Sequence, residues 1–101
     1  MKPIKPATAL ALGRLLRNNR KRLNLSVRYV AAQSSVKFGY LASVERGEVE
    51  RPKIKMLEAL ASMYGLNPDD IIIMAGKIPS DVYWKVVRCP ELIEVIRKHQ
   101  E

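Results

Sequence analysis

Apolar side chains recur three and four residues apart along most of the chain, in blocks separated by glycine and proline. Leu12 and Leu16 share one such face, and Leu57 and Leu60 share another. This spacing matches the 3.6-residue turn of an α-helix rather than the alternation of a strand. The stretch 71–73 is rich in β-branched residues, but it follows a helix-start signal. The pattern therefore predicts an all-α protein.

Breaker and capping residues divide this pattern into seven expected helices. Thr8 and Ser26 carry hydroxyl groups that can cap a helix N-terminus. Asn67 followed by Pro68 gives a similar start signal, with proline at the first helical position. The helices are expected at about residues 8–23, 26–34, 37–46, 53–65, 67–76, 80–88 and 90–99.

The second and third expected helices have the spacing of a helix-turn-helix. Ser26 opens the first of the pair, and a turn of three to four residues separates it from the next short helix. Ala31 lies five residues after the cap, where a bulky side chain would block close crossing of the two helices. Many other helix corners look alike, so this spacing alone does not establish DNA binding.

The charge of the chain is both large and uneven. Lysine and arginine outnumber aspartate and glutamate by 18 to 10, which gives a net charge of +8. Residues 1–55 hold 13 basic and 3 acidic side chains, whereas residues 56–101 hold 5 basic and 7 acidic ones. A basic half joined to a mildly acidic half favours a polyanion-binding face with a non-binding back. A solubilising surface is the alternative interpretation.

Residues with catalytic or metal-binding chemistry are scarce. Cys89 and His99 are the single cysteine and the single histidine, which excludes an internal disulfide and a Cys/His zinc site. No glycine-rich phosphate loop and no nucleophile–base pair is present, and Asp69-Asp70 fits the positive end of a helix. We therefore expect no enzyme, no catalytic residue, no metal and no cofactor. The longest apolar run is about six residues, too short for a membrane span, so a cytoplasmic protein is expected.

A longer set of residues extends the helix-turn-helix match to all of the first five expected helices. It comprises Leu12-Gly13, Arg20-Lys21, Leu25-Ser26, Ala31, Val36, Tyr40-Leu41, Val44-Glu45-Arg46-Gly47, Arg51-Pro52, Leu57, Leu60-Ala61, Gly65-Leu66, Asp69 and Ile71-Ile72. With this set, residues 12–76 resemble the Cro/C1-type helix-turn-helix domain of the XRE family. The resemblance implies a lambda-repressor-like, five-helix DNA-binding domain at residues 1–76, with a short basic arm at 1–7.

The resemblance also implies how the domain meets DNA. The first helix of the pair lies across the backbone and the second enters the major groove. The base-reading positions would be Lys37, Phe38 and Gly39 in the first turn of that second helix, and Ser43 one turn further. Gly39 has no side chain to read with, but it lets the helix approach the bases closely. Lysine donates to guanine, and phenylalanine packs on a thymine methyl group; burial in the core is the alternative for Phe38. Contacts with phosphates or the minor groove are implied for Ser26, Arg28, Arg46, Arg51, Lys53 and Arg17, with a solvated helix face as the alternative for Arg17.

Arg20 and Glu45 match a structural ion pair of the family, which is implied to tie the first helix to the third. Elsewhere the chain departs from the family at four positions. Val27 stands where the family often has a glutamine that bonds a phosphate, and Lys37 stands where it usually has a serine or threonine cap. Glu48 and Glu50 add negative charge to the loop after the third helix. Arg28 can substitute for the missing glutamine.

Residues 77–101 lie beyond the five-helix domain and are rich in apolar side chains. This segment either caps the first and fifth helices or builds a subunit interface. Tryptophan and tyrosine are enriched in interface cores, and relatives bind palindromic operators as twofold dimers. We therefore expect a homodimer. Its expected interface comprises Val82, Tyr83, Trp84, Val87, Leu92, Ile93 and Ile96.

Two functions fit these features. The first is a dimeric repressor that binds double-stranded DNA at a palindromic operator and blocks polymerase by occlusion. The second is an antitoxin or anti-regulator whose C-terminal helices bind a protein partner, such as a toxin or an anti-repressor, with DNA binding secondary. The basic N-terminal half favours the first, and the apolar C-terminal segment leaves room for the second. The arm at residues 2–6 either reaches into a groove or ends as a frayed terminus.

Overall fold

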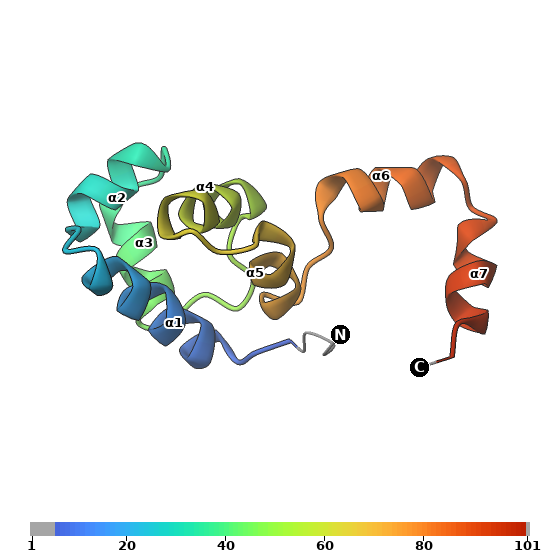
Figure 1. The fold of residues 1–101 in the computed structure, drawn as a ribbon, viewed down its shortest axis with the longest axis horizontal. Coiled ribbons are helices and arrows are strands. Elements are labelled where there is room, and N and C mark those ends of the chain that lie inside the picture. The colour runs from blue at the N-terminus through green and yellow to red at the C-terminus, as the bar shows by residue number, and fades with distance from the viewer. Residues whose placement is uncertain (1–5, 101) are drawn as a thin grey trace.

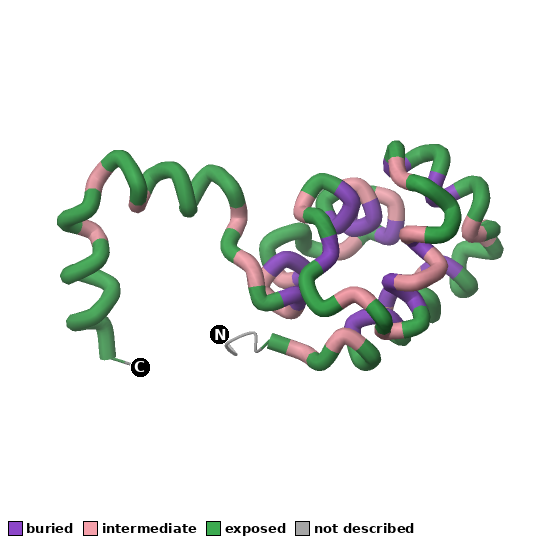
Figure 2. The backbone as a smooth tube through the Cα atoms, turned by 180° about the vertical axis from the view of Figure 1, so that it is seen from behind, coloured by how far each residue is buried: buried purple, intermediate pink, exposed green. Residues whose placement is uncertain are grey.

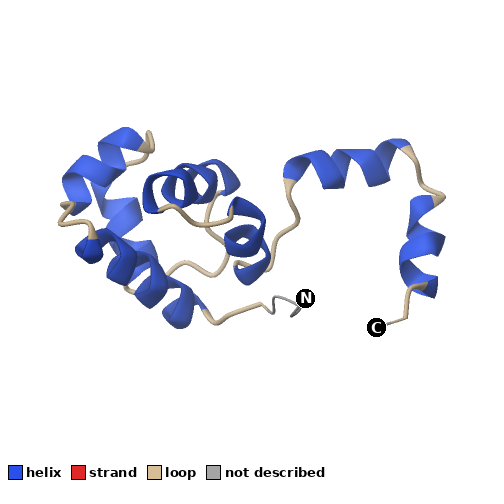
Figure 3. Ribbon diagram, in the orientation of Figure 1, coloured by secondary structure: helices blue, strands red, loops and turns tan. Residues whose placement is uncertain are grey.

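The computed structural model describes residues 6–100, which form seven α-helices and no strand (Figures 1 and 3). This confirms the all-α prediction of five helices followed by two short ones. Of the basic arm, residues 1–5 lie outside the described part of the chain. The helices are α1 (Ala9–Arg22), α2 (Val27–Gln33), α3 (Phe38–Glu45), α4 (Ile54–Tyr64), α5 (Pro68–Met74), α6 (Ser80–Arg88) and α7 (Leu92–Lys98).

Three helices begin at the side-chain caps that the sequence predicted. Thr8 Oγ1 accepts a hydrogen bond from the Ala11 N–H at 3.0 Å, and Ser26 Oγ accepts one from the Tyr29 N–H at 3.1 Å. The Asn67 side chain caps α5 in the same way. These bonds satisfy amide groups that have no partner inside the helix, and each is worth about 1 kcal/mol. The local sequence therefore sets where these helices start.

The apolar faces of α1 to α5 meet in one core, seen as the buried segments of Figure 2. Met56 is also buried, although the sequence pattern did not single it out. Val36 and Tyr40 pack on the core but are only partly buried. The buried apolar set is Leu12, Leu16, Val30, Ala31, Leu41, Val44, Met56, Leu57, Leu60, Ala61, Tyr64, Ile71, Ile72 and Ala75.

The close crossing of α1 and α3 depends on Gly13. A Cβ atom at this position would lie 2.5 Å from the carbonyl oxygen of Val44 and 2.6 Å from that of Glu45. Both neighbours are backbone atoms, so they cannot rotate away as the end of a side chain can. Glycine at position 13 therefore allows α1 to pack directly against the C-terminal turn of α3.

One polar atom of the core has no hydrogen-bond partner among residues 6–100. It is the hydroxyl of Tyr64, a side chain that is only 3% exposed. Burial raises the pKa of Tyr64 to about 12, because it disfavours the phenolate; Glu45 adds to this shift and Arg20 opposes it. A buried hydroxyl without a partner costs the free energy of its lost hydration.

We expect Tyr64→Phe to stabilise the domain by about 1–2 kcal/mol, because the ring stays packed while the unpaired hydroxyl is removed. Urea unfolding monitored by circular dichroism would measure the shift of the midpoint. Tyr40→Phe is the matched control, since the Tyr40 hydroxyl accepts a hydrogen bond from the Lys53 N–H at 3.0 Å. The control should lower the midpoint, and a lower midpoint for Tyr64→Phe as well would show that its hydroxyl is bonded.

Helices α6 and α7 project away from the five-helix domain (Figures 1 and 2). Neither helix has a buried residue. The alternative in which they cap α1 and α5 is therefore wrong for this chain. Helix α6 has its predicted bounds, whereas α7 begins at Leu92 rather than Pro90, because residues 90–91 form a turn.

Candidate nucleic-acid interface

Helices α2 and α3 form a tight helix-turn-helix corner. The Val36 N–H donates to the Ala31 carbonyl at 3.0 Å, and Ser34 Oγ donates to the Val30 carbonyl at 2.6 Å. Ser35 closes the turn with a φ of 56°, the left-handed conformation. Ala31 is 2% exposed, so its small side chain lies where the two helices meet. The corner therefore has the short turn and the small buried residue that the sequence predicted.

This corner leaves the first turn of α3 open to solvent. Leu41 and Val44 bury the opposite face of α3 in the core. Lys37, Phe38 and Gly39 are exposed, and they stand together at the start of the helix. Phe38 is 45% exposed, so the alternative of a buried core position is wrong. Ser43 is partly buried, one turn further along.

Arg28 of α2 and Phe38 of α3 contact each other across the corner. The guanidinium carbon of Arg28 lies 4.7 Å from the centroid of the Phe38 ring, within the range of a cation–π interaction. The two residues are ten positions apart in the sequence, and no local spacing pairs them. The sequence named both as DNA contacts but gave no signal that they act on each other.

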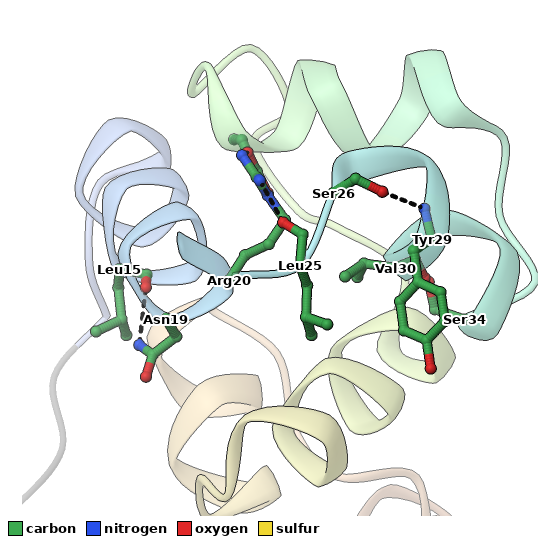
Figure 4. A network of polar contacts seen from close by, with 9 residues as sticks. Leu15, Asn19, Arg20, Leu25, Ser26, Tyr29, Val30 and Ser34 are labelled. Carbon is green, nitrogen blue, oxygen red and sulfur yellow. Dashed lines mark hydrogen bonds and ion pairs between the residues drawn. The ribbon is translucent and has the colours of Figure 1, made fainter. Parts of the chain in front are cut away.

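A buried ion pair fixes α3 to α1. Arg20 Nε donates to Glu45 Oε2 at 2.7 Å, and a second guanidinium nitrogen donates to Oε1 at 2.9 Å. The third nitrogen donates to the Leu25 carbonyl at 2.8 Å, which ties the start of the α2 segment to the same centre (Figure 4). The hydrogen bond with Glu45 raises the pKa of Arg20, against the opposing effect of burial. The orientation of α3 therefore depends on a charged contact inside the domain.

The loop between α3 and α4 contains a second Arg–Glu pair, which is exposed. Arg46 donates two hydrogen bonds to Glu48, both at 2.9 Å, and a third to Ser43 Oγ at 3.2 Å. The hydrogen bond lowers the pKa of Glu48 and raises that of Arg46. Arg46 and Ser43, which were both predicted to contact DNA, thus hydrogen-bond to each other in the unbound chain. Arg46 must leave Glu48, or share its donors, to bind a phosphate.

Three lysines help to line a cavity between the N-termini of α3 and α4. Its volume is about 490 Å³, and Lys37, Lys53 and Lys55 are among its lining residues. The Lys53 ammonium lies 5.1 Å from the centroid of the Tyr40 ring, a cation–π distance. Lys55 was not among the predicted contacts. The fold adds it to the basic surface, because the start of α4 faces the start of α3.

The remaining predicted phosphate contacts are spread around this corner. Ser26 uses its side chain to cap α2, and Arg17 and Arg51 are exposed on α1 and on the loop before α4.

No cluster of metal-ligating side chains occurs within residues 6–100. Within the same residues, no helix combines the length and apolarity needed to cross a membrane.

The chain belongs to the helix-turn-helix domain family, whose model matches residues 11–71. This agrees with the Cro/C1-type resemblance of residues 12–76. Among curated proteins, none matches the chain significantly.

Solved structures of bacterial regulators share the fold. The clp gene regulator ClgR from Corynebacterium glutamicum is 32% identical over 71% of this chain and 92% of its own, with a TM-score of 0.55. A second ClgR structure is 26% identical over 91% and 93% of the two chains, with a TM-score of 0.58, so the similarity extends beyond residue 76. The restriction-modification controller protein C.AhdI from Aeromonas hydrophila is 25% identical over 62% and 94%, with a TM-score of 0.56.

Proposed function

We propose that this protein is a transcription regulator that binds double-stranded DNA sequence-specifically, with α3 in the major groove. The observation that carries the proposal is the exposed first turn of α3, held on a helix-turn-helix corner by the Arg20–Glu45 pair. The similarity to ClgR, a gene regulator, and to C.AhdI, a controller protein, supports the same function. It is not proposed to be an enzyme.

Individual roles follow from position on this corner. Lys37 and Phe38 read bases, Gly39 lets the helix approach the bases closely, and Ser43 contacts the groove one turn later. Arginine, lysine and a helix N-terminus bind phosphate through charge and N–H donors. The residues proposed for the phosphates or the minor groove are Ser26, Arg28, Arg46, Arg51, Lys53, Lys55 and Arg17.

We further propose that the chain divides at residue 76 into a DNA-binding domain and a dimerisation segment. Tyr83 and Trp84 pack edge to face, with ring centroids 5.1 Å apart, and are each 52% exposed. Other apolar side chains on α6 and α7, such as Val87 and Ile96, are exposed as well. Charges on residues 77–100 are mixed, with 5 basic and 3 acidic side chains, which suits pairing of identical copies. A dimer of this kind would bind a palindromic operator and exclude polymerase from it, which makes a repressor. The proposed interface comprises Val82, Tyr83, Trp84, Val87, Leu92, Ile93 and Ile96.

A protein partner is the second candidate for the same surface. Most apolar side chains of α6 and α7 are exposed in the single chain, as a surface for a toxin or an anti-repressor would be. The chain also resembles, in fold alone, a chain of the SinR protein/SinI protein complex, at 21% identity and a TM-score of 0.56. DNA binding would then be secondary to partner binding.

The first test is DNA binding to the region upstream of the protein's own gene, against a scrambled fragment of equal composition. Each fragment is measured by fluorescence anisotropy at low and at physiological salt. Binding to one upstream fragment at least about a thousandfold tighter than to the scrambled control is expected for a specific regulator. Equal and weak binding to both, lost steeply with salt, would contradict sequence specificity and favour the partner-binding function.

Lys37→Ala should weaken binding to the operator by about 1–3 kcal/mol and leave binding to scrambled DNA nearly unchanged, because Lys37 is proposed to read a base. Competition anisotropy with both fragments would measure the two losses. Lys98→Ala removes an equal charge at the end of α7 and is the matched control. An equal loss on both fragments would make Lys37 a phosphate contact instead.

A further inference from the structure

The contact between Arg28 and Phe38 places an exposed aromatic ring beside a positive charge at the start of α3. Arg28 lies over the Phe38 ring, 4.7 Å from its centroid, and the ring is still 45% exposed. Arg28 and Lys37 are both exposed beside it, so the ring stands in a positively charged surface. Gly39, the next position, has no side chain with which to read a base. Phe38 is therefore the exposed apolar side chain in the first turn of α3, where Leu41 is buried and Tyr40 is partly buried.

We infer that Arg28 and Phe38 together read the C5-methyl group of a pyrimidine in the major groove, whether thymine or 5-methylcytosine carries it. The inference rests on the proposed function and names the base chemistry that α3 recognises. A phenyl ring has no donor or acceptor, so it discriminates between base edges through apolar contact. The methyl group at C5 is the apolar group that the major groove presents.

Arg28 acts in this site as a positioning residue. The face of the Phe38 ring attracts the positive charge of the Arg28 guanidinium. This contact leaves the N–H groups of the guanidinium able to bind phosphate oxygens. The contact thereby restrains the ring while the same arginine is anchored to the DNA backbone. Without the cation, the ring of an exposed phenylalanine samples other rotamers and meets the methyl group less often.

Removing the methyl group from the recognised base should weaken binding about fourfold per half-site, which corresponds to ~0.8 kcal/mol for one buried methyl-sized group. The DNA is an operator selected from random duplexes at physiological salt. Each thymine is replaced in turn by deoxyuridine, a change that removes the methyl group and nothing else. One position in each half-site is expected to show the fourfold loss. At that position, a G·C pair carrying 5-methylcytosine should bind about fourfold tighter than the same pair unmethylated.

Variants assign this effect to the two residues. Phe38→Ala should bring the thymine-to-uracil affinity ratio to about one, and Arg28→Ala should lower the ratio. Arg28→Lys, which keeps a cation, should restore it. Tyr29→Ala is the control, because Tyr29 is an exposed aromatic residue on α2, 51% exposed, outside the proposed contacts; its ratio should match that of the wild type. All four substitutions are at exposed positions, and circular dichroism verifies that each variant is folded.

The outcomes separate this inference from the proposed function. A wild-type protein that prefers its operator but binds thymine and uracil equally at every position overturns the methyl reader and leaves the regulator. An unchanged ratio in Arg28→Ala, with equal weakening on both bases, overturns the role of Arg28 and leaves it a plain phosphate contact. A wild-type protein that selects no sequence from the random duplexes overturns both proposals.

Discussion

Replacing Glu45 with alanine is expected to lower the free energy of unfolding by about 3–5 kcal/mol. The substitution leaves Arg20 buried and charged, with two of its three hydrogen-bonded nitrogens deprived of their partner. The side chains of the pair are only 11% and 6% exposed, so water does not readily replace the lost carboxylate. The loss is large because an unpaired charge remains inside the domain, not because the intact pair is strongly stabilising.

Urea unfolding would measure this loss, with coincident transitions by circular dichroism and a second spectroscopic probe as the test that unfolding stays two-state. Glu48→Ala is the matched control, since it breaks the Arg46–Glu48 pair, which has the same chemistry but is exposed. The control should change the midpoint little, because water screens and solvates that pair. The double variant Arg20→Met/Glu45→Leu should regain much of the stability by replacing the ion pair with apolar contacts. Equal midpoints for Glu45→Ala and Glu48→Ala would contradict the prediction that breaking the buried pair costs more stability than breaking the exposed pair.

Removing residues 77–101 is expected to give a folded monomer whose operator affinity is lower by about a hundredfold or more. Helices α6 and α7 contribute no buried residue to the core, so the five-helix domain should keep its stability. The loss in affinity arises because a monomer binds one half-site, whereas in a dimer the second half-site binds as an intramolecular event.

Sedimentation equilibrium would establish the mass of both chains, and anisotropy with a whole operator and a half-site would measure their affinities. A full-length variant with Trp84→Ser and Ile93→Ser is the control, because it keeps both helices and removes two apolar anchors that are 52% and 39% exposed. It should behave like the truncated chain. A truncated chain that stays dimeric would contradict the proposed interface, and a monomeric full-length chain would favour the protein-partner function.

Sequence spacing predicted the helices well, because the signals that start and stop them are local. Ser26 caps α2 within its own first turn, and Gly65 ends α4 with a φ of 70° that glycine adopts without strain. The apolar stripes of α1 and α4 identified most of the core for the same reason. The predicted start of α7 was less accurate: the helix begins at Leu92, because residues 90–91 form a turn.

The sequence also named the residues of the candidate interface, through a family pattern in which Lys37 and Phe38 open the second helix of the pair. It could not give their contacts. The pairing of Arg28 with Phe38 requires the turn that brings two helices together. The pairing of Arg46 with Glu48 depends on the path of a loop, which no periodicity describes.

By itself, then, the sequence determined the helices, most of the core, the family and the positions that face DNA in the proposal, because these follow from neighbours along the chain. The tertiary structure decided which side chains meet: Phe38 with Arg28, the backbone of α3 with Gly13, and Lys55 with the basic surface. It also decided that α6 and α7 stand away from the domain. Such contacts depend on distances between elements far apart in the chain, and those distances are fixed only when the core packs.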